Sequence, residues 1–506
     1  MHWWKPLSAV ALVALFLSSC ANGTTNKTTN SSSSFAQRAC PSGAANAHVT
    51  CGLVTVPADH HNSNGKTIKV AIAIFQRGSK PDPDPVFFLQ GGPGGSSIEA
   101  FTSAFTSDQF SFGNHDVIFV DQRGTGLSQP SLQCSEVVDL QYHFDTNLTT
   151  QQQIASQNTA LNTCYSRLIG EGINLSDYTT YNDAGDIQDI MHALNLHGAN
   201  LYGVSYGTRL AQEVMRSFPQ GITSVVLDST VPPDYKLLTR IPPNTVRVFN
   251  TLFQGCASDP NCSSKYPNLQ STFYGVVDQL NKSPITFQTT DQGDSAENPH
   301  TNKTFTIVLN GDDFLNVVFS AFYLSEAIPA LPKLITEVQQ GNYNDLLTKF
   351  YGIFEYDDGI SWGMYFSVEC AEDVDFTSAQ EIDTASQSYP TDIRADQDAG
   401  LQSEIPQCQR WNVSKVPDSQ RAPITSSIPT IVLEGEYDPV TPPANGDHVL
   451  QGLSHAQKYL FPGTGHGSFF NSTSTCPSGI VQQFFANPNQ FPDGSCTGTM
   501  GEPQFQ

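Results

Sequence analysis

Short apolar runs alternate with segments of helical spacing along much of the chain. Most of the runs hold four or five apolar residues, which is typical of strands buried on both faces. Ala184, Ile187 and Met191 repeat at helical spacing between two runs, and Leu210 and Val214 do so after another run. The predicted strands are Ile68–Phe75, Val86–Leu89, Val117–Val120, Asn200–Val204, Ser224–Leu227, Thr430–Leu433 and Lys458–Phe461.

This alternation predicts an α/β fold, in which helices flank a mostly parallel sheet. The rhythm stops between residues 232 and 422, and this stretch separates two strands that should be neighbours. A surface loop can hold such an insertion, because the entropy of loop closure grows only slowly with length. We therefore predict a core of residues 46–231 and 423–506, with a largely helical cap domain inserted at residues 232–422.

The N-terminus has the layout of a secretory signal peptide. Lys5 precedes an apolar run from Leu7 to Leu17, which is too short to span a bilayer comfortably, and small residues follow. We predict a signal peptide at residues 1–20 and a flexible tether at residues 21–45, because the stretch after the signal is rich in Asn, Thr and Ser.

The end of that signal also resembles a bacterial lipobox, with the sequence Leu17-Ser18-Ser19-Cys20. Lipidation of Cys20 would then anchor the mature chain to a membrane, and an ordinary signal peptide with a nearby cut is the alternative. Either way, we expect an extracytoplasmic protein, attached to a membrane through the lipid or secreted.

The net charge of the chain limits the kinds of partner that we expect it to bind. The 506 residues include 48 acidic and 24 basic ones, giving a formal net charge of −24. Such a balance argues against binding nucleic acid or an anionic membrane through a basic face. It fits ligands with a positive group, although a solvated acidic surface is the simpler explanation.

Eleven cysteines agree with export. Setting Cys20 aside leaves an even number, which in an oxidising compartment predicts a disulfide framework. No Cys-x-x-Cys pair or Cys/His cluster has metal-site spacing, so we expect no zinc. Pairing in sequence order would join each pair within one local unit: Cys40–Cys51, Cys134–Cys164, Cys256–Cys262, Cys370–Cys408 and Cys476–Cys496.

The sequence Gly203-Val204-Ser205-Tyr206-Gly207 lies between a predicted strand and a predicted helix. A nucleophile elbow requires this context, since the tight turn lifts the serine hydroxyl clear of the sheet and flanking glycines avoid steric clash. We predict Ser205 as a catalytic nucleophile; a plain turn serine is the alternative.

A serine nucleophile needs a histidine to take its proton and a carboxylate to hold that histidine. Asp438 follows the strand Thr430–Leu433, at the edge where α/β sheets build their sites, and Glu436 is its competitor. His466 follows the last predicted strand in a glycine-rich loop. The chain order Ser205, Asp438, His466 is the order expected of an elbow serine hydrolase.

Acyl transfer also needs donors for the developing oxyanion, each contributing about 3–4 kcal/mol. The N–H of Tyr206, directly after the nucleophile, is one donor. We assign the other to Gly92, in preference to Gly91, in the loop that follows Val86–Leu89. Phosphate binding by this loop is disfavoured, because it has neither Gly-Lys-Ser/Thr nor Gly-x-Gly-x-x-Gly.

Together these motifs resemble the α/β-hydrolase serine peptidases of the prolyl-aminopeptidase and tripeptidyl-aminopeptidase type. The resemblance runs from about Cys51 to Cys496 and rests on the Asp438 and His466 loops and on three strings: Gly91-Gly92-Pro93-Gly94, Asp121-Gln122-Arg123-Gly124-Thr125-Gly126-Leu127-Ser128 and Gly203-Val204-Ser205-Tyr206-Gly207-Thr208. The disulfide-rich, large-capped form looks most like the tripeptidyl-aminopeptidase branch.

Two details of the strings qualify this resemblance. Gln90 departs from it, since relatives commonly have His or Asn there. We expect Asp121 and Arg123 to fix the loop architecture.

The resemblance implies an α/β-hydrolase fold whose cap binds the free amine of a peptide substrate through acidic residues. Glu369, Glu372 and Asp373 form the candidate cluster, and a solvated acidic surface is the alternative. The expected activity is a cofactor-free exopeptidase that releases one residue or a tripeptide through an acyl-enzyme. An esterase or lipase with the same triad, and a catalytically inactive surface binding protein, are the rivals.

Overall fold

The computed structural model describes residues 34–46, 48–106, 110–142, 147–290, 303–350 and 359–506. The predicted signal peptide, Cys20 and the first part of the predicted tether lie outside these residues.

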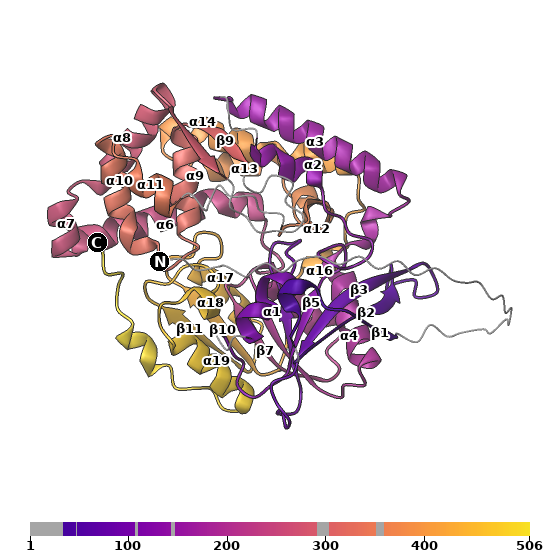
Figure 1. Cartoon of the computed structure of the whole chain (residues 1–506). Coiled ribbons are helices and arrows are strands. Elements are labelled where there is room, and N and C mark those ends of the chain that lie inside the picture. Colours follow the sequence, from indigo (N-terminus) through magenta and orange to yellow (C-terminus); the bar gives the residue numbers. More distant parts are fainter. Residues whose placement is uncertain (1–33, 47, 107–109, 143–146, 291–302, 351–358) are drawn as a thin grey trace.

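The described residues form a nine-stranded sheet in the order β1-β2-β3-β5-β4-β6-β7-β10-β11 (Figure 1). The six strands from β5 to β11 in this order run parallel, and β1, β2 and β3 are antiparallel to their neighbours. The strands are β1 (Phe35–Arg38), β2 (Val49–Pro57), β3 (Thr67–Phe75), β4 (Val86–Leu89), β5 (Val117–Asp121), β6 (Ala199–Val204), β7 (Ile222–Asp228), β10 (Thr430–Gly435) and β11 (Ala456–Phe461).

Every predicted strand is present within two residues of its predicted ends, and the α/β class is confirmed. The long antiparallel strand β2 was not predicted. Thr50, Gly52 and Thr55 interrupt its apolar pattern, whereas the parallel strands inside the sheet are continuous apolar runs.

Helices cover both faces of the sheet. Helices α4 and α5 pack on one face, and α1, α18 and α19 pack on the other. The helices of the first part of the chain are α1 (Ile98–Thr106), α2 (Ser135–Val138), α3 (Thr150–Gly170), α4 (Thr180–Ala193) and α5 (Tyr206–Ser217). Those of the last part are α17 (Pro443–Leu450), α18 (Ser468–Asn471) and α19 (Cys476–Ala486).

The long insertion between β7 and β10 is mainly helical and lies over one end of the sheet (Figure 1). Its elements are α6 (Leu237–Ser258), α7 (Pro260–Lys265), α8 (Leu269–Lys282), β8 (Ile285–Thr290), β9 (Thr304–Leu309), α9 (Gly311–Ala321), α10 (Leu331–Gln339), α11 (Asn344–Lys349), α12 (Trp362–Glu372), α13 (Ala379–Ser386), α14 (Thr391–Gln402), α15 (Glu404–Trp411) and α16 (Asp418–Arg421).

This insertion has two parts. Helices α6 to α11 enclose a hydrophobic core of their own. In contrast, α12 and α15 contribute to the core that the sheet shares with α4 and α5. Helix α3 was predicted to belong to the main core, but it lies against α14 and α15. Tyr165 of α3 faces Trp411 of α15 with 5.7 Å between ring centroids. The cap layer therefore draws on two separate parts of the chain.

All five predicted disulfides are formed. One of them corrects the tether predicted for residues 21–45. Phe35–Arg38 pairs with β2, and Cys40 is bonded to Cys51. The ring of Phe35 covers Gly52, so this apolar residue gains burial in the sheet instead of remaining in a polar tether.

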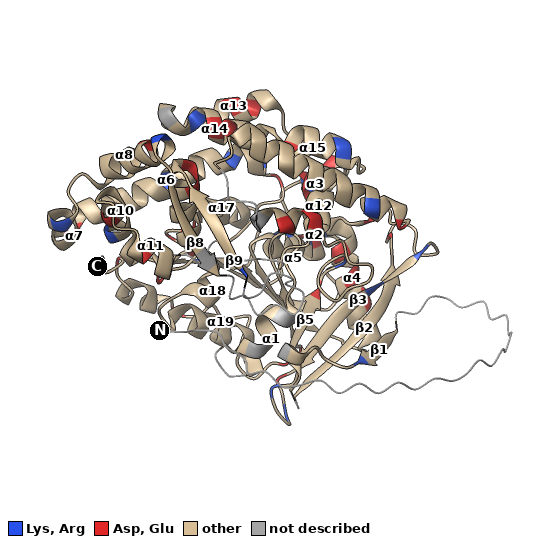
Figure 2. Ribbon diagram, turned by 45° about the horizontal axis from the view of Figure 1, so that its top comes forward, with Lys and Arg blue, Asp and Glu red and all other residues tan. Residues whose placement is uncertain are grey.

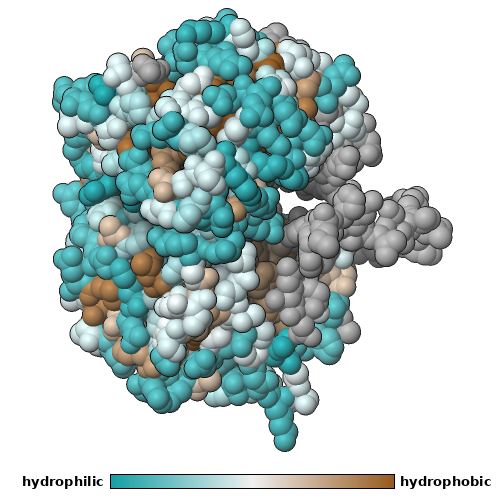
Figure 3. Space-filling model, turned by 90° about the vertical axis from the view of Figure 1, so that its left-hand side faces the viewer, coloured by the Kyte–Doolittle hydropathy of each residue, from teal (hydrophilic) through white to brown (hydrophobic). Residues whose placement is uncertain are grey.

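Most of the surface shown in Figure 3 is hydrophilic, with apolar side chains in small separate areas. Acidic residues are spread over core and cap, and Lys and Arg are fewer (Figure 2). Among the described helices, none has the length and apolar character needed to cross a membrane.

Candidate active site

The turn between β6 and α5 has the strained geometry of a nucleophile elbow. Ser205 has φ 57° and ψ −127°, and its N–H donates to the carbonyl of Asp228 at 3.0 Å. A Cβ on Gly203 would collide with the carbonyl oxygen of Gly207, and one on Gly207 with that of Leu89. The glycines on both sides of Ser205 are therefore required by close backbone packing.

The glycine-rich loop after β4 packs directly against this serine. A Cβ on Gly91 would lie 2.7 Å from the Cβ of Ser205. Gly92, at φ 119°, is exposed beside it, and Tyr206 begins α5. The amides proposed for the oxyanion thus come from two segments that meet at the nucleophile.

Asp438 and His466 meet through a hydrogen bond. His466 Nδ1 lies 2.8 Å from Asp438 Oδ2. The carboxylate also accepts from the Val440 and Thr441 amides at 3.0 and 2.7 Å and from the Thr441 hydroxyl at 2.7 Å. Glu436, the competing acid, instead accepts from the amide of Gly463 at 3.0 Å. His466 is therefore paired with Asp438, whereas Glu436 binds the backbone of the histidine loop.

The pair is buried, and its electrostatics favour an ionised acid beside the imidazole. Burial acts to raise the pKa of Asp438, but His466 and the bonds from Thr441 outweigh it and leave the pKa lowered. Burial acts to lower the pKa of His466, but Asp438, and then Asp228, leave it raised. Such a histidine is a competent base held in one tautomer.

A second carboxylate, which the sequence analysis missed, holds the histidine loop. Asp228, at the end of β7, accepts from the amides of Ser468 and Phe469 at 2.8 and 2.9 Å and from the Tyr202 hydroxyl at 2.6 Å. The hydroxyl of Ser229 accepts from the amide of Gly467 at 2.8 Å. Consecutive amides after His466 are thereby tied to the strand beside the nucleophile.

Asp121 and Arg123 fix loop architecture, as predicted. Asp121 accepts from the amides of Ser97, Ile98 and Leu127 at 2.8–3.0 Å, which joins its own loop to the start of α1. Arg123 is fully buried and pairs with Asp186 at 2.7 Å. Among the described residues, the hydrogen bonds and ion pairs of these two side chains are made with groups other than Asp438 and His466.

The cap carboxylates predicted to bind an amine are all buried, but two of them already bind protein groups. Glu372 accepts from the amide and hydroxyl of Thr180 at 2.6 and 2.7 Å and pairs with Arg209 at 3.3 Å. Asp373 accepts from the amide of Leu237, at the start of α6, at 2.8 Å. These contacts indicate structural roles for Glu372 and Asp373.

Glu369 differs, because its carboxylate accepts no hydrogen bond from any described residue. Burial, then the charge of Asp373, raises its pKa well above the usual range. Glu404, at the start of α15, belongs to the same cluster, and burial with the charge of Asp373 raises its pKa to about 7. We refer to Glu369 and Glu404 as the acidic pair.

Two tyrosines, Tyr323 and Tyr365, interact with His466 and with the acidic pair. Tyr323 faces His466 with 4.9 Å between ring centroids. Burial raises the pKa of Tyr365 well above its usual range, and the charges of Glu404, Glu369, Asp373 and Tyr323 raise it further. Tyr323 and Tyr365 thus form an electrostatic link between His466 and the acidic pair.

Helix α12 gives a second connection. Ser361, just before it, donates through its amide to the carbonyl of Gly94 at 2.8 Å, and the amide of Ser96 donates to Gly359 at 3.1 Å. A Cβ on Gly94 would collide with the Ser361 carbonyl. The helix that carries Glu369 thus starts on the proposed oxyanion loop.

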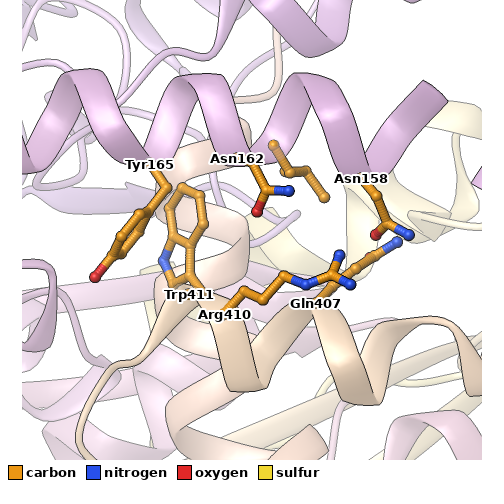
Figure 4. A pocket seen from close by; sticks show the side chains of 7 residues that line it. Asn158, Asn162, Tyr165, Gln407, Arg410 and Trp411 are labelled. Carbon is orange, nitrogen blue, oxygen red and sulfur yellow. The ribbon is translucent and has the colours of Figure 1, made fainter. Parts of the chain in front are cut away.

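A separate small hollow lies between α3 and α15 (Figure 4). Asn158, Asn162 and Tyr165 of α3 face Gln407, Arg410 and Trp411 of α15, and none of the predicted site residues lines it. Among the described residues, Cys134, Glu136 and Cys164 form the one group with metal-ligand spacing, and its two sulfurs are joined in a disulfide.

Comparison with known proteins identifies two matching regions. Residues 84–307 match the family model of the alpha/beta hydrolase fold, and residues 397–496 match that of TAP-like protein. Tripeptidyl aminopeptidase of Streptomyces coelicolor is 31% identical over 199 residues, which is 37% of this chain and 36% of the relative. The chain therefore matches only about a third of that relative's length.

Longer matches are more distant. Serine protease Hip1 of Mycobacterium tuberculosis is 22% identical over 480 residues, covering 88% of this chain and 86% of Hip1. Among solved structures, proline iminopeptidase of Mycobacterium smegmatis has 13% identity and a TM-score of 0.40, with coverage of 86% of this chain and 98% of its own.

Proposed function

The chain belongs to the α/β-hydrolase family with a TAP-like C-terminal region, and from this premise we propose that it is a serine peptidase acting on free peptide N-termini. The observation that carries the proposal is the joint placement of the Ser205 elbow, the Asp438–His466 pair and the Glu369 carboxylate, which accepts no hydrogen bond from the described residues. Relatives named as an aminopeptidase and a serine protease support the reaction class.

In the proposed reaction, Ser205 Oγ attacks the scissile carbonyl carbon while His466 Nε2 takes the hydroxyl proton. Asp438 holds the proton on His466 Nδ1 and stabilises the imidazolium. The amides of Tyr206 and Gly92 donate to the oxyanion. His466 then gives its proton to the leaving amine, and an acyl-enzyme remains. A water molecule, deprotonated by His466, hydrolyses that ester and returns Ser205 to its free form.

The acidic pair is proposed to bind the ammonium group of the substrate. The α-amine of a peptide has a pKa of about 7.7–8.0, so it is largely cationic near neutral pH. A charge-assisted hydrogen bond from the ammonium would stabilise Glu369 in its ionised form, which burial otherwise disfavours. Internal peptide bonds and blocked N-termini would be poor substrates, and the products would be short N-terminal fragments.

We propose an extracytoplasmic location, with peptides as substrates and no nucleic-acid partner. The five disulfides support it, because such bonds persist in oxidising compartments. Attachment through a lipid on Cys20 remains part of the proposal.

The first test is labelling of the purified protein with a fluorophosphonate probe, with Ser205→Ala as the control. We expect stoichiometric labelling of the wild type and none of the variant, and a fall of about 10⁶-fold in kcat for the variant. Absence of labelling would favour the inactive binding protein.

The second test compares one peptide nitroanilide in its free and N-acetylated forms with an acyl ester. We expect the free form to be strongly preferred over the acetylated one. Rapid ester hydrolysis with no cleavage of either peptide would favour the carboxylesterase or lipase alternative.

A further inference from the structure

Cap helix α6 binds the turn that carries Asp438. The Arg247 guanidinium donates to the carbonyl oxygen of Glu436 at 2.8 Å and also to the carbonyl oxygen of Asp438. Asn244, one helical turn earlier, donates through its side-chain amide to the carbonyl of Val440 at 2.9 Å. One face of α6 therefore holds three alternate carbonyls of the acid turn.

The backbone N–H groups of the same turn bind the acid itself. The amides of Val440 and Thr441 donate to the Asp438 carboxylate. Tyr437, within the turn, is buried in the cap core and stacks on Phe322 at 6.5 Å. The catalytic acid consequently lies between sheet and cap, and each of its neighbours along the turn is tied to one or the other.

We propose that Arg247 is a positioning residue for catalysis, which through the Glu436 and Asp438 carbonyls holds the Asp438 carboxylate on His466. The proposal rests on the proposed triad. A guanidinium suits the task, because its planar array of donors can bind two carbonyls at once in fixed geometry, which an ammonium cannot do.

Arg247 also adds a positive charge behind the acid. Burial lowers the pKa of Arg247, but the charges of Asp438 and Glu436 oppose this effect, and a guanidinium stays ionised at any working pH. The other charged or titratable groups around the pair are Asp228 beside His466, Glu434 beside Asp438, and Tyr323 from the cap. Loss of the Arg247 cation should therefore raise the pKa of His466.

The test is a double-mutant cycle of Arg247→Gln with Asp438→Asn, with rates measured on an activated acetyl ester and by fluorophosphonate labelling of Ser205. If Arg247 acts through the acid, Arg247→Gln should lower kcat by about 10–100-fold in the wild type and less than twofold in the Asp438→Asn background. The acid limb of its pH–rate profile should move to higher pH, with KM little changed.

Matched variants separate positioning from simple cap stability. Arg240→Gln removes an arginine from the same helix, where it lies over Tyr235, and should leave kcat unchanged. Arg247→Lys should recover part of the activity and keep the wild-type pH profile, because it retains the charge and one donor contact. Asn244→Ala should have a smaller effect in the same direction as Arg247→Gln.

Equal losses in both backgrounds of the cycle would overturn the proposal, as would a wild-type labelling rate in Arg247→Gln. Should Arg247→Gln fail to fold, the same cycle with Arg247→Lys and Asn244→Ala decides, and additive effects there would overturn it. A wild type that is not labelled at Ser205 would instead remove the proposed function itself.

Discussion

Asp438 and Glu369 are both buried carboxylates, yet the protein surrounds them in opposite ways. Asp438 accepts hydrogen bonds from two amides, a hydroxyl and the imidazole, and its pKa is lowered. Glu369 accepts none from the described residues, and its pKa is raised well above the usual range. The first is fixed as an anion by hydrogen bonds from the protein, whereas at the second burial and the charge of Asp373 outweigh the Arg209 cation and favour the neutral form.

This difference separates two tasks. A catalytic acid must hold one geometry throughout the reaction, so its partners belong to the protein. A binding carboxylate must leave its acceptors free for the ligand, and the folded protein bears the cost of that unsatisfied burial. Carboxyl-to-amide substitutions test the comparison directly, because they remove the charge at nearly constant size.

The largest effect is expected at the acid. Asp438→Asn should lower kcat about 10⁴-fold, because the amide favours the wrong histidine tautomer. Steady-state kinetics on the free peptide and on the acetyl ester should show the same loss. Glu436→Gln, two residues away, is the matched control and should remain near wild type; a greater loss there would reverse the acid assignment.

A smaller and more selective effect is expected at the binding carboxylate. Glu369→Gln should lower kcat/KM for a free peptide by about 10–100-fold, since a hydrogen bond to a charged group contributes about 1.5–3 kcal/mol. Rates with the N-acetylated peptide should not change. Asp383→Asn, an exposed carboxylate elsewhere in the cap, serves as control. Equal losses on both peptides would show that Glu369 is structural.

The smallest effect is a pH dependence. Glu404, with a pKa raised to about 7, is protonated and neutral below that pH and anionic above it. The ratio of kcat/KM for free and acetylated peptide should therefore rise severalfold from pH 6 to pH 7.5, before the substrate amine itself deprotonates. Taking the ratio cancels the titration of His466. In Glu404→Gln the ratio should be flat over this range; a slope equal to wild type would remove Glu404 from the amine site.

The sequence allowed the sheet to be predicted, and candidates for a triad to be placed on it, because both signals are local. A parallel strand inside a sheet is a continuous apolar run, and the nucleophile, acid and histidine each follow such a run at its carboxyl end. The predicted tether extended too far along the chain because Phe35 is a single apolar residue in a polar stretch. Its packing on Gly52 is not visible in the sequence.

The proposed amine site could be inferred only in part from the sequence, because it joins segments distant in sequence. Glu404 is one isolated glutamate at the start of a helix, and nothing local distinguishes it. The predicted bond Cys370–Cys408 was the available signal, since it requires α12 and α15 to lie together and so brings Glu404 near Glu369. Arg247 had no such signal, because its acceptors are backbone carbonyls, which the sequence does not mark.

Helix α12 has a consequence for the size of the product. Ser361 contacts the proposed oxyanion loop and Glu369 is eight residues further on, a separation of about 12 Å at the α-helical rise. An extended peptide covers about 3.3–3.6 Å per residue, so a substrate held at both proposed contacts would have about three residues between its amine and the scissile carbonyl. Because the length of a helix is fixed, α12 would set the distance between the two proposed contacts and hence the length of the released fragment. Inserting one turn, about 5.4 Å, would lengthen the released fragment by one or two residues.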